Sequence, residues 1–540
     1  MSAVHRHLRN QRLRNQRLRT RTCSGAAALL GIAALATGIM SSVAPSAPGP
    51  AGSSPAVAPV SATAPADRPN FVFILADDLD QTTSPYWAAM PYTASLIRDR
   101  GMTFTNGFAP TPICCPARGT ILTGKYGHNT GVLTNSGDVG GWATFAANGN
   151  EEKTFARHLH DAGYDTALVG KYMNGIEADP THVPPGWSEW YGSADNFFYT
   201  GYNYALNENG AIVDYGGPEN PANYSTDVVA AKSTDFIRRA AAGDEPFFLY
   251  AASTAPHLPL PPAPRHADNP FADDAAPRTP NFNEPDVSDK PWWLQQSARE
   301  RSAQVAVVNN QDYQNRMGSL YALDEMVRDI VETLRSVGEL DDTYLVFTSD
   351  NGYNLGAHRL INKQAPYDES MRVPLVVAGP GIAPGTDNHM VAHIDLAPTF
   401  LELAGVGIPA DVDGRSLVPL LHGTRPASWR TDLLGQYAGP GVDGQDGIAA
   451  EAVAHAAAVY LDIPPWSGLR TERYLYVRWY DLDRSPQIHE RELYDLSADS
   501  YQLTNLLATP AGRAENAALV ADLDTRLNEL AACSGATCRS

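Results

Sequence analysis

Apolar runs of strand length, each ending abruptly in polar residues, recur along this sequence. The first run, Asn70–Ala76 (NFVFILA), leads straight into Asp77 and Asp78. A continuous apolar run of this length is typical of a parallel strand that is buried on both faces. Two carboxylates at the end of such a strand are costly to bury unless cations meet them. The pattern therefore predicts an α/β fold in which charged partners gather where the strands end.

Three later runs have the same organisation. The runs at 165–170, 246–251 and 343–348 lead, in turn, into Lys171, His257 and the pair Asp350–Asn351. Taken alone, each has an ordinary explanation as a surface lysine, a structural histidine or a turn. In an open α/β sheet, however, functional sites lie outside the carboxyl ends of the strands. Because all these polar groups follow strands, we expect them to share one site, where carboxylate and amide oxygens suit a hard divalent cation.

The segment Ile113–Lys125 predicts a loop that delivers a cysteine to the start of a helix. Pro116 suits the first helical position, and Gly124 suits the left-handed residue after the helix end. The Cys114 side chain would lie beside the unpaired N–H groups of the helix start, which favour negative charge. Arg118 would lean back along the same helix face. This arrangement predicts a site that binds and attacks an oxyanion ester.

The same segment carries a family resemblance. Cys114-x-Pro116-Ala117-Arg118, followed by Leu122-Thr123-Gly124-Lys125, resembles the signature of the type I sulfatases, and most resembles their N-acetylglucosamine-6-sulfatase branch. The resemblance implies hydrolysis of sulfate monoesters, on sulfated sugars such as N-acetylglucosamine 6-sulfate. It also implies an alkaline-phosphatase-like fold, in which helices flank a large mixed sheet and a small antiparallel-sheet subdomain follows at the C-terminus.

The resemblance assigns a role to each candidate residue. In the family the first cysteine, Cys114 here, is oxidised by a formylglycine-generating enzyme to Cα-formylglycine, and Arg118 would hold this nucleophile. The implied metal ligands are Asp77, Asp78, Cys114 as modified, Asp350 and Asn351. The implied sulfate contacts are Lys171, His257 and Lys363, which would neutralise the developing charge and protonate the leaving oxygen, with Lys363 also contacting the bridging oxygen. All-oxygen ligands favour Ca²⁺ or Mg²⁺, and the longer, looser coordination favours Ca²⁺. Many relatives carry a histidine where this chain has Asn174, so we do not expect that loop to protonate the leaving group.

Changes of composition divide the chain into three parts. Residues 1–66 combine an arginine-rich start, the apolar run Gly25–Met40 and a Pro/Ala/Ser-rich spacer, as an export signal with a linker does. An uncleaved N-terminal anchor is the alternative, although the run is short for a membrane span, and we expect no stable membrane insertion. A catalytic domain is expected over 67–425 and a C-terminal subdomain over 426–540.

The C-terminal part has its own pattern. Arg473–Tyr480 alternates like a half-exposed antiparallel strand, and Glu492–Leu496 predicts a second one. Leucines between 519 and 530 mark one face of a closing helix. Cys533 and Cys538 predict a small disulfide loop of an exported chain, with two unpaired thiols as the alternative.

Several features near the middle of the chain are less specific. The segment Pro261–Lys290 is long enough to be either functional or disordered. Trp292 and Trp293 could stack on a sugar ring, although ordinary packing explains them equally well. His358 could contact the substrate or only shape its loop. Gln304–Val337 predicts a long helix that ends at Gly338.

The charge of the chain restricts its partners. Its 540 residues carry a formal net charge of −20, which repels nucleic acid and anionic membranes. We therefore expect a small-molecule or glycan sulfate ester as the partner. Small or terminal sulfate esters would approach such a surface more easily than a long polyanion.

Other functions remain open on the sequence alone. An aryl sulfatase, or a formylglycine-type phosphonate or phosphate monoester hydrolase, would share these motifs, and comparing the turnover of the different esters would separate them. A cysteine hydrolase would instead use Cys114 as a thiolate and His257 as its base. A carbohydrate-binding module would hydrolyse no sulfate ester at all.

Overall fold

The computed structural model describes residues 68–81, 85–297, 302–424, 426–440, 463–481 and 487–539. The predicted export signal and spacer over 1–66 lie outside these residues. Within the described ranges, no helix is both long enough and apolar enough to cross a membrane. The division into domains at residues 67–425 and 426–540 stays a prediction.

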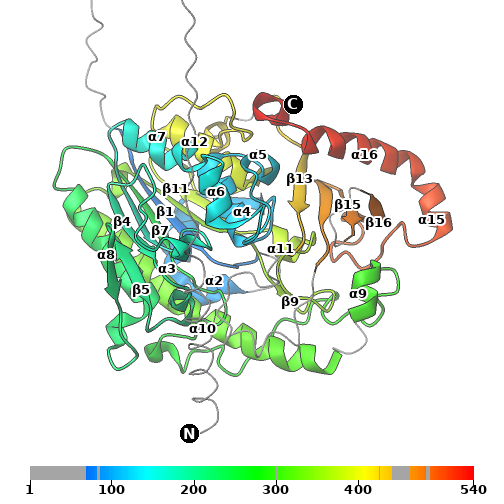
Figure 1. The fold of residues 1–540 in the computed structure, drawn as a ribbon, viewed down its shortest axis with the longest axis horizontal. Coiled ribbons are helices and arrows are strands. Elements are labelled where there is room, and N and C mark those ends of the chain that lie inside the picture. The colour runs from blue at the N-terminus through cyan, green and yellow to red at the C-terminus, as the bar shows by residue number, and fades with distance from the viewer. Residues whose placement is uncertain are drawn as a thin grey trace, which may run out of the picture. The chain divides into compact units, whose positions relative to one another are not determined.

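A ten-stranded mixed sheet occupies the centre of the fold, in the order β12-β2-β11-β8-β1-β7-β3-β4-β5-β6 (Figure 1). Its strands are β1 (Asn70–Ala76), β2 (Met102–Phe108), β3 (Asp165–Gly170), β4 (Glu189–Ser193), β5 (Ala205–Glu208), β6 (Ala211–Asp214), β7 (Phe247–Ala252), β8 (Thr343–Ser349), β11 (Leu375–Ala378) and β12 (Gly385–Ala392). The four central strands β8, β1, β7 and β3 run parallel. β11 is antiparallel to both of its neighbours, and β5 and β6 are antiparallel at one edge. The predicted large mixed sheet is confirmed, and the four predicted strands are its centre.

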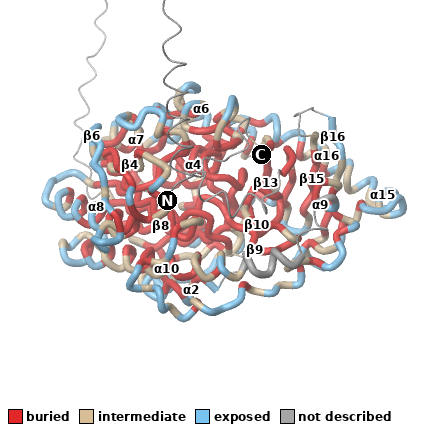
Figure 2. The backbone as a smooth tube through the Cα atoms, turned by 60° about the horizontal axis from the view of Figure 1, so that its bottom comes forward, coloured by how far each residue is buried: buried red, intermediate tan, exposed pale blue. Residues whose placement is uncertain are grey.

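The two faces of the sheet bury different side chains of the same strands. In β1, Val72 and Ile74 pack into one apolar cluster, whereas Phe71, Phe73 and Leu75 pack into another. Because neighbouring side chains of a strand point to opposite faces, a strand covered on both sides must be apolar throughout. Each large side chain that is fully buried contributes about 1.5–3 kcal/mol relative to an exposed one. Figure 2 shows the resulting continuous buried centre, with exposed residues confined to the periphery.

Two helical layers cover these faces (Figure 1). One layer contains α2 (Tyr86–Ala89), α3 (Pro91–Leu96), α8 (Ser225–Ala240) and α10 (Ser302–Val337); the other contains α4 (Cys114–Thr123), α6 (Gly141–Ala147), α7 (Phe155–Asp161) and α12 (Leu396–Leu403). The predicted helix over 304–337 is therefore confirmed as α10. The short helix α7 begins after Thr154, whose side chain caps it by accepting a hydrogen bond from the Arg157 backbone N–H over 3.2 Å.

Helix α4 begins earlier than the proline in it suggests. Its first residue is Cys114, so Pro116 is the third helical residue rather than the first. The proline fits there because the N–H groups of the first turn have no partner within the helix. At the other end, Gly124 has a φ of +69°, as predicted, and an added Cβ atom would lie 2.9 Å from Cγ1 of Val412. The glycine therefore allows both the left-handed turn and the close packing that follows it.

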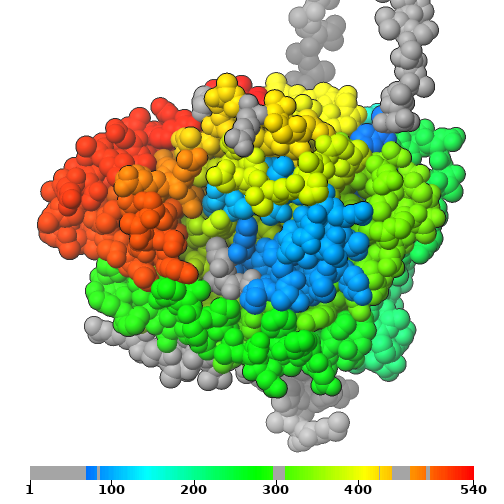
Figure 3. All heavy atoms as spheres, turned by 180° about the vertical axis from the view of Figure 1, so that it is seen from behind, coloured from blue at the N-terminus to red at the C-terminus, as the bar shows by residue number. Residues whose placement is uncertain are grey.

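A second, four-stranded antiparallel sheet forms near the C-terminus, as expected. Its strands are β13 (Asp432–Tyr437), β14 (Trp466–Thr471), β15 (Tyr474–Tyr480) and β16 (Ile488–Asp495), in that order. The closing helix α16 (Ala517–Ala531) buries Leu523, Leu527 and Leu530, and Cys533 and Cys538 form the predicted disulfide. Figure 3 shows these orange and red segments gathered on one side, next to green segments from the middle of the chain.

Candidate active site

Polar side chains follow each of the four central parallel strands. Asp77 and Asp78 follow β1, and Lys171 follows β3. His257 comes after β7, and Asp350 comes directly after β8. Because these strands are parallel neighbours, their carboxyl ends meet at one edge of the sheet, and these polar side chains converge there.

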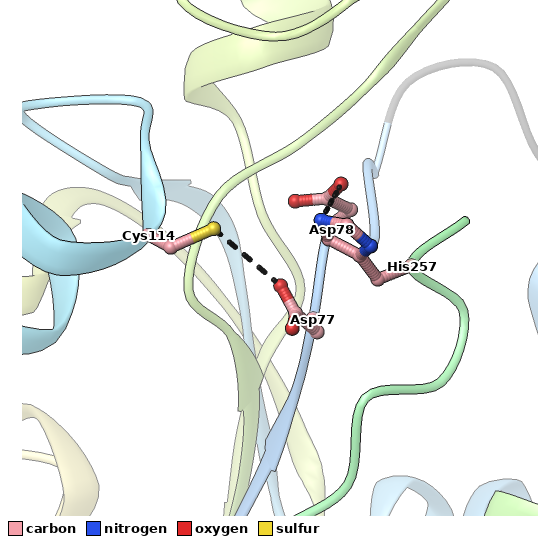
Figure 4. Close-up of side chains that lie close together, drawn as sticks. All are labelled: Asp77, Asp78, Cys114 and His257. Atoms are coloured by element: carbon pink, nitrogen blue, oxygen red, sulfur yellow. Dashed lines mark hydrogen bonds and ion pairs between the residues drawn. The ribbon is translucent and has the colours of Figure 1, made fainter. Parts of the chain in front are cut away.

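Cys114 enters this site from the start of helix α4 (Figure 4). Its Sγ lies 3.8 Å from Oδ1 of Asp77, and the Lys363 ammonium group donates to it over 3.0 Å. Burial raises the pKa of the Cys114 thiol to about 11. Burial also lowers the pKa of His257 to about 4, so a thiolate beside a protonated imidazole is unfavourable. The site as folded is poorly suited to a cysteine hydrolase.

Arg118 connects helix α4 to three of the strand ends. Its side chain is completely buried, and Nε donates to Oδ2 of Asp350 over 2.8 Å. One terminal nitrogen donates to the backbone carbonyl of Lys171, also over 2.8 Å, and the other lies 3.7 Å from Asp77. The guanidinium group therefore fixes α4 against the ends of β3, β1 and β8.

Charges of both signs are buried together in the site. Lys171 donates to Oδ2 of Asp77 over 2.6 Å, and Lys363 pairs with Asp78. Burial alone would raise the pKa of both carboxyl groups, but the neighbouring cations outweigh it and hold each pKa below the ordinary value. The same ion pairs raise the pKa of both lysines, against the effect of burial. Both acids are therefore ionised and both lysines protonated at neutral pH.

Several oxygens in the site fit a divalent cation. Ligand atoms of Asp77, Asp78, Cys114 and His257 all lie within 4.8 Å of one another. Oδ1 of Asn351 is buried and accepts no hydrogen bond from any described residue, while its Nδ2 donates to Oδ1 of Asp78 over 2.7 Å. This buried oxygen has no hydrogen-bond donor in the described part of the chain and lies next to two buried carboxylates. A hard cation bound there would satisfy all three groups.

Asp350 is more fully engaged than the other proposed ligands. Its Oδ1 accepts from the backbone N–H groups of Asp78 and Asn351, over 3.1 and 2.9 Å. Its Oδ2 accepts from Arg118. Asp350 therefore positions its neighbours as well as being a candidate ligand, whereas Nε2 of His257 lies 3.6 Å from Oδ2 of Asp78.

Two residues that the sequence did not point to complete the surroundings of the site. Tyr199 packs against both Lys171 and His257, with its ring centroid 4.9 Å from the Lys171 ammonium nitrogen and 4.7 Å from the His257 ring. Arg316, on α10, donates to the backbone carbonyl groups of Asp78 and Pro256. It thereby supports Asp78, whose φ of +68° is unusual for a residue with a side chain. Neither residue belongs to a local motif, so only tertiary packing identifies them.

The less specific candidates have structural roles in this fold. His358 is buried, and its Nδ1 lies 2.9 Å from Oε2 of Glu284, so the long segment before Trp292 supports the loop that carries Lys363. Trp293 packs on Trp479, with ring centroids 5.1 Å apart. The packing interpretation therefore describes this tryptophan better than sugar stacking does.

The Asn174 side chain lies between Cys115 and Tyr199. Its Oδ1 lies 3.4 Å from Sγ of Cys115, and its Nδ2 donates to the Tyr199 hydroxyl oxygen over 3.3 Å. The Cys115 thiol is therefore engaged by Asn174, and neither Cys114 nor Cys115 is in a disulfide.

Comparisons with known proteins identify the family of the chain. The sulfatase family model matches residues 69–406. An N-acetylglucosamine-6-sulfatase from Capra hircus is 35% identical over 489 residues, which cover 88% of this chain and 85% of that protein. An arylsulfatase from Volvox carteri is 31% identical, over 89% of this chain and 77% of that protein. A solved structure in complex with its substrate D-glucosamine-2-N,6-O-disulfate is 26% identical, with a TM-score of 0.65 over 86% of this chain and 97% of the other.

Proposed function

The chain belongs to the sulfatase family and is a sulfuric ester hydrolase, and on that premise we propose that its substrates are 6-O-sulfate esters of N-acetylglucosamine. The observation that carries the proposal is the 35% identity to an N-acetylglucosamine-6-sulfatase over most of both chains. The similar structure that binds a 6-O-sulfated glucosamine supports it independently.

We place the nucleophile at residue 114. Conversion of Cys114 to formylglycine supplies an aldehyde hydrate, which attacks sulfur where a buried thiol would be protonated and inert. Arg118 holds the first turn of α4 against the acids, so the nucleophile keeps its direction as the substrate enters. Lys363, 3.0 Å from the residue 114 side chain, is placed to orient its attacking group.

The proposed metal is Ca²⁺, held by Asp77, Asp78, Asp350 and Asn351 together with the modified residue 114, with Mg²⁺ as the alternative. When bound, such an ion supplies Lewis-acid polarisation of the sulfate. Lys171, His257 and Lys363 bind the sulfate oxygens and stabilise the charge that develops on them. Because both lysines remain protonated, these contacts do not depend on the pH near neutrality.

Export is proposed for the mature protein. The arginine-rich and apolar segment at the N-terminus supports it, as does the disulfide between Cys533 and Cys538, since such bonds persist in oxidising compartments. Maturation of Cys114 would require a formylglycine-generating enzyme as a partner.

Two measurements together test the proposed function. The mass of the peptide that contains residue 114 shows whether the thiol has become an aldehyde. Sulfate release from N-acetylglucosamine 6-sulfate is then compared with sulfate release from the 3-sulfated isomer and with phosphate release from N-acetylglucosamine 6-phosphate. We expect the 6-sulfate to be preferred; equal turnover of all three, by protein with a verified aldehyde, would contradict the proposal.

An aryl sulfatase is the second candidate, because a relative of that activity is 31% identical over most of this chain. Its signature would be a higher kcat/KM for 4-nitrophenyl sulfate than for every sugar sulfate tested. The same preparation and the same assay of released sulfate serve both comparisons.

A further inference from the structure

Tyr199 lies at the wall of the site, on the short helix η4 (Asn196–Thr200). Its ring contacts two residues that we assign to the sulfate, Lys171 and His257. Its hydroxyl oxygen accepts a hydrogen bond from Nδ2 of Asn174 over 3.3 Å. The tyrosine is thus held in place by three neighbours and has little freedom to turn.

The groups that hydrogen-bond to the Tyr199 hydroxyl oxygen, Asn174 and Lys171, are donors. The Asn174 amide is oriented by Cys115, whose Sγ lies 3.4 Å from Oδ1, so the NH₂ end faces the tyrosine. The Lys171 ammonium group can only donate. A phenol oxygen that is surrounded by donors must direct its own hydrogen elsewhere, and among the described residues no acceptor takes it. The O–H is therefore available to a substrate atom.

Exposure to solvent is lowest at Cys114 and higher at the residues around Tyr199. Cys114 is 1% exposed, His257 6% and Tyr199 9%, whereas Phe197, on the same short helix as Tyr199, is 50% exposed. A sugar is larger than the sulfate that it carries, so it must lie on the outer side. In a displacement at sulfur with the two oxygens in line, the departing oxygen lies opposite the attacking one, so it would lie on the more exposed side of the site, as Tyr199 does.

We propose that Tyr199 is a further catalytic residue, whose hydroxyl group donates a hydrogen bond to the oxygen that joins the sugar to the sulfate. This inference rests on the proposed sulfatase mechanism. As the bond between sulfur and the sugar oxygen breaks, its electron pair stays on that oxygen, and the hydrogen bond from Tyr199 strengthens with the growing charge. The phenol keeps its proton. The proton that the nucleophile gives up balances the one that the departing oxygen finally takes.

The test uses a series of substituted phenyl sulfates whose leaving groups differ in acidity, with the wild-type enzyme and Tyr199→Phe. A basic leaving group holds more negative charge on the departing oxygen in the transition state than an acidic one does. Removing a hydrogen-bond donor to that oxygen should therefore slow the hydrolysis of esters with basic leaving groups most. We expect kcat/KM of Tyr199→Phe to fall about 10²-fold for the most basic leaving group and less than about threefold for the most acidic one. The slope of log kcat/KM against leaving-group pKa would thus become steeper.

Tyr202→Phe is the matched control, since Tyr202 is a nearby buried tyrosine that packs on Tyr224 in the core. Its slope should equal that of the wild-type enzyme. An equal loss across the whole series for Tyr199→Phe, or no loss, would overturn the assignment, because a role in packing alone cannot depend on the leaving group. If the wild-type enzyme hydrolyses no sulfate ester, the proposed function itself fails instead.

Discussion

The Lys363 ammonium group bridges Cys114 and Asp78: it donates to the cysteine sulfur over 3.0 Å and pairs with the buried carboxylate. One cation thus contacts both the nucleophile position and a proposed metal ligand. A hairpin of β9 (Asn354–Leu355) and β10 (Ile361–Asn362) brings it there. The proposed catalytic role of Lys363 therefore depends on a loop whose position is set by packing outside the main sheet.

Lys363→Ala should lower kcat for a sulfate ester about 10²–10³-fold, because the Lys363 ammonium group stabilises the charge of the transition state more than that of the bound substrate. Steady-state kinetics with 4-nitrophenyl sulfate measure the effect. Lys232→Ala is the control, since that lysine pairs with Glu208 near the other edge of the sheet. A rate within threefold of the wild-type value would remove Lys363 from the mechanism.

Cys114→Ala should abolish activity and leave the fold intact, because the side chain is small and buried. Cys115→Ala is the matched control, since it changes the adjacent thiol and keeps the nucleophile. Circular dichroism and sulfate release are measured for both variants. Residual turnover in Cys114→Ala above that of the buffer would contradict a nucleophile at residue 114.

Removal of Ca²⁺ should inactivate the enzyme and lower its Tm, because ligands that bind only the folded state stabilise it. Dialysis against EGTA, which prefers Ca²⁺ to Mg²⁺, removes the ion. Added Ca²⁺ should restore activity and Tm, and added Mg²⁺ should restore them only weakly. Asp77→Asn should need a higher Ca²⁺ concentration for the same Tm. If neither activity nor Tm responds to the chelator, the metal proposal is wrong.

Stability should fall between pH 6.5 and pH 4 in part because of His393, which follows β12. Burial lowers its pKa to about 4, and its ring nitrogens accept no hydrogen bond from the described residues. The unfolded chain then binds a proton that the folded chain does not, so the free energy of unfolding decreases as the pH falls. The full effect of this one group is about 3 kcal/mol.

Urea unfolding at several pH values measures this effect. His393→Gln should flatten the decrease in the free energy of unfolding over that interval. The exposed residue His422 provides the control through His422→Gln. An unchanged pH dependence in His393→Gln would show that His393 already binds a proton in the folded state.

The central strands and their polar ends could be predicted because both signals are local. An apolar run such as Asn70–Ala76 and the acids after it are adjacent in the chain, and parallel strands place all such ends at one edge. The start of α4 was misplaced by two residues, since the first turn of a helix tolerates proline at more than one position. The closing disulfide followed from its short spacing.

Tyr199 and Arg316 could not be predicted, for a different reason. Each acts across a large separation in sequence: Arg316 supports Asp78 from α10, and Tyr199 reaches Lys171 and His257 from a short helix without a pattern of its own. Such contacts arise only when the layers of the fold pack together. The same holds for His358, whose structural partner, Glu284, lies in a segment without regular structure.

The burial of Cys114 restricts when its proposed modification can take place. With 1% of its surface exposed and every other residue of α4 buried around it, the thiol is out of reach of a second enzyme once the chain has folded. The proposed oxidation to formylglycine would therefore occur on the nascent or unfolded chain, in competition with folding itself. On this proposal, a variant that folds faster would leave more molecules unmatured, and the relative rates of the two events would set the yield of active enzyme.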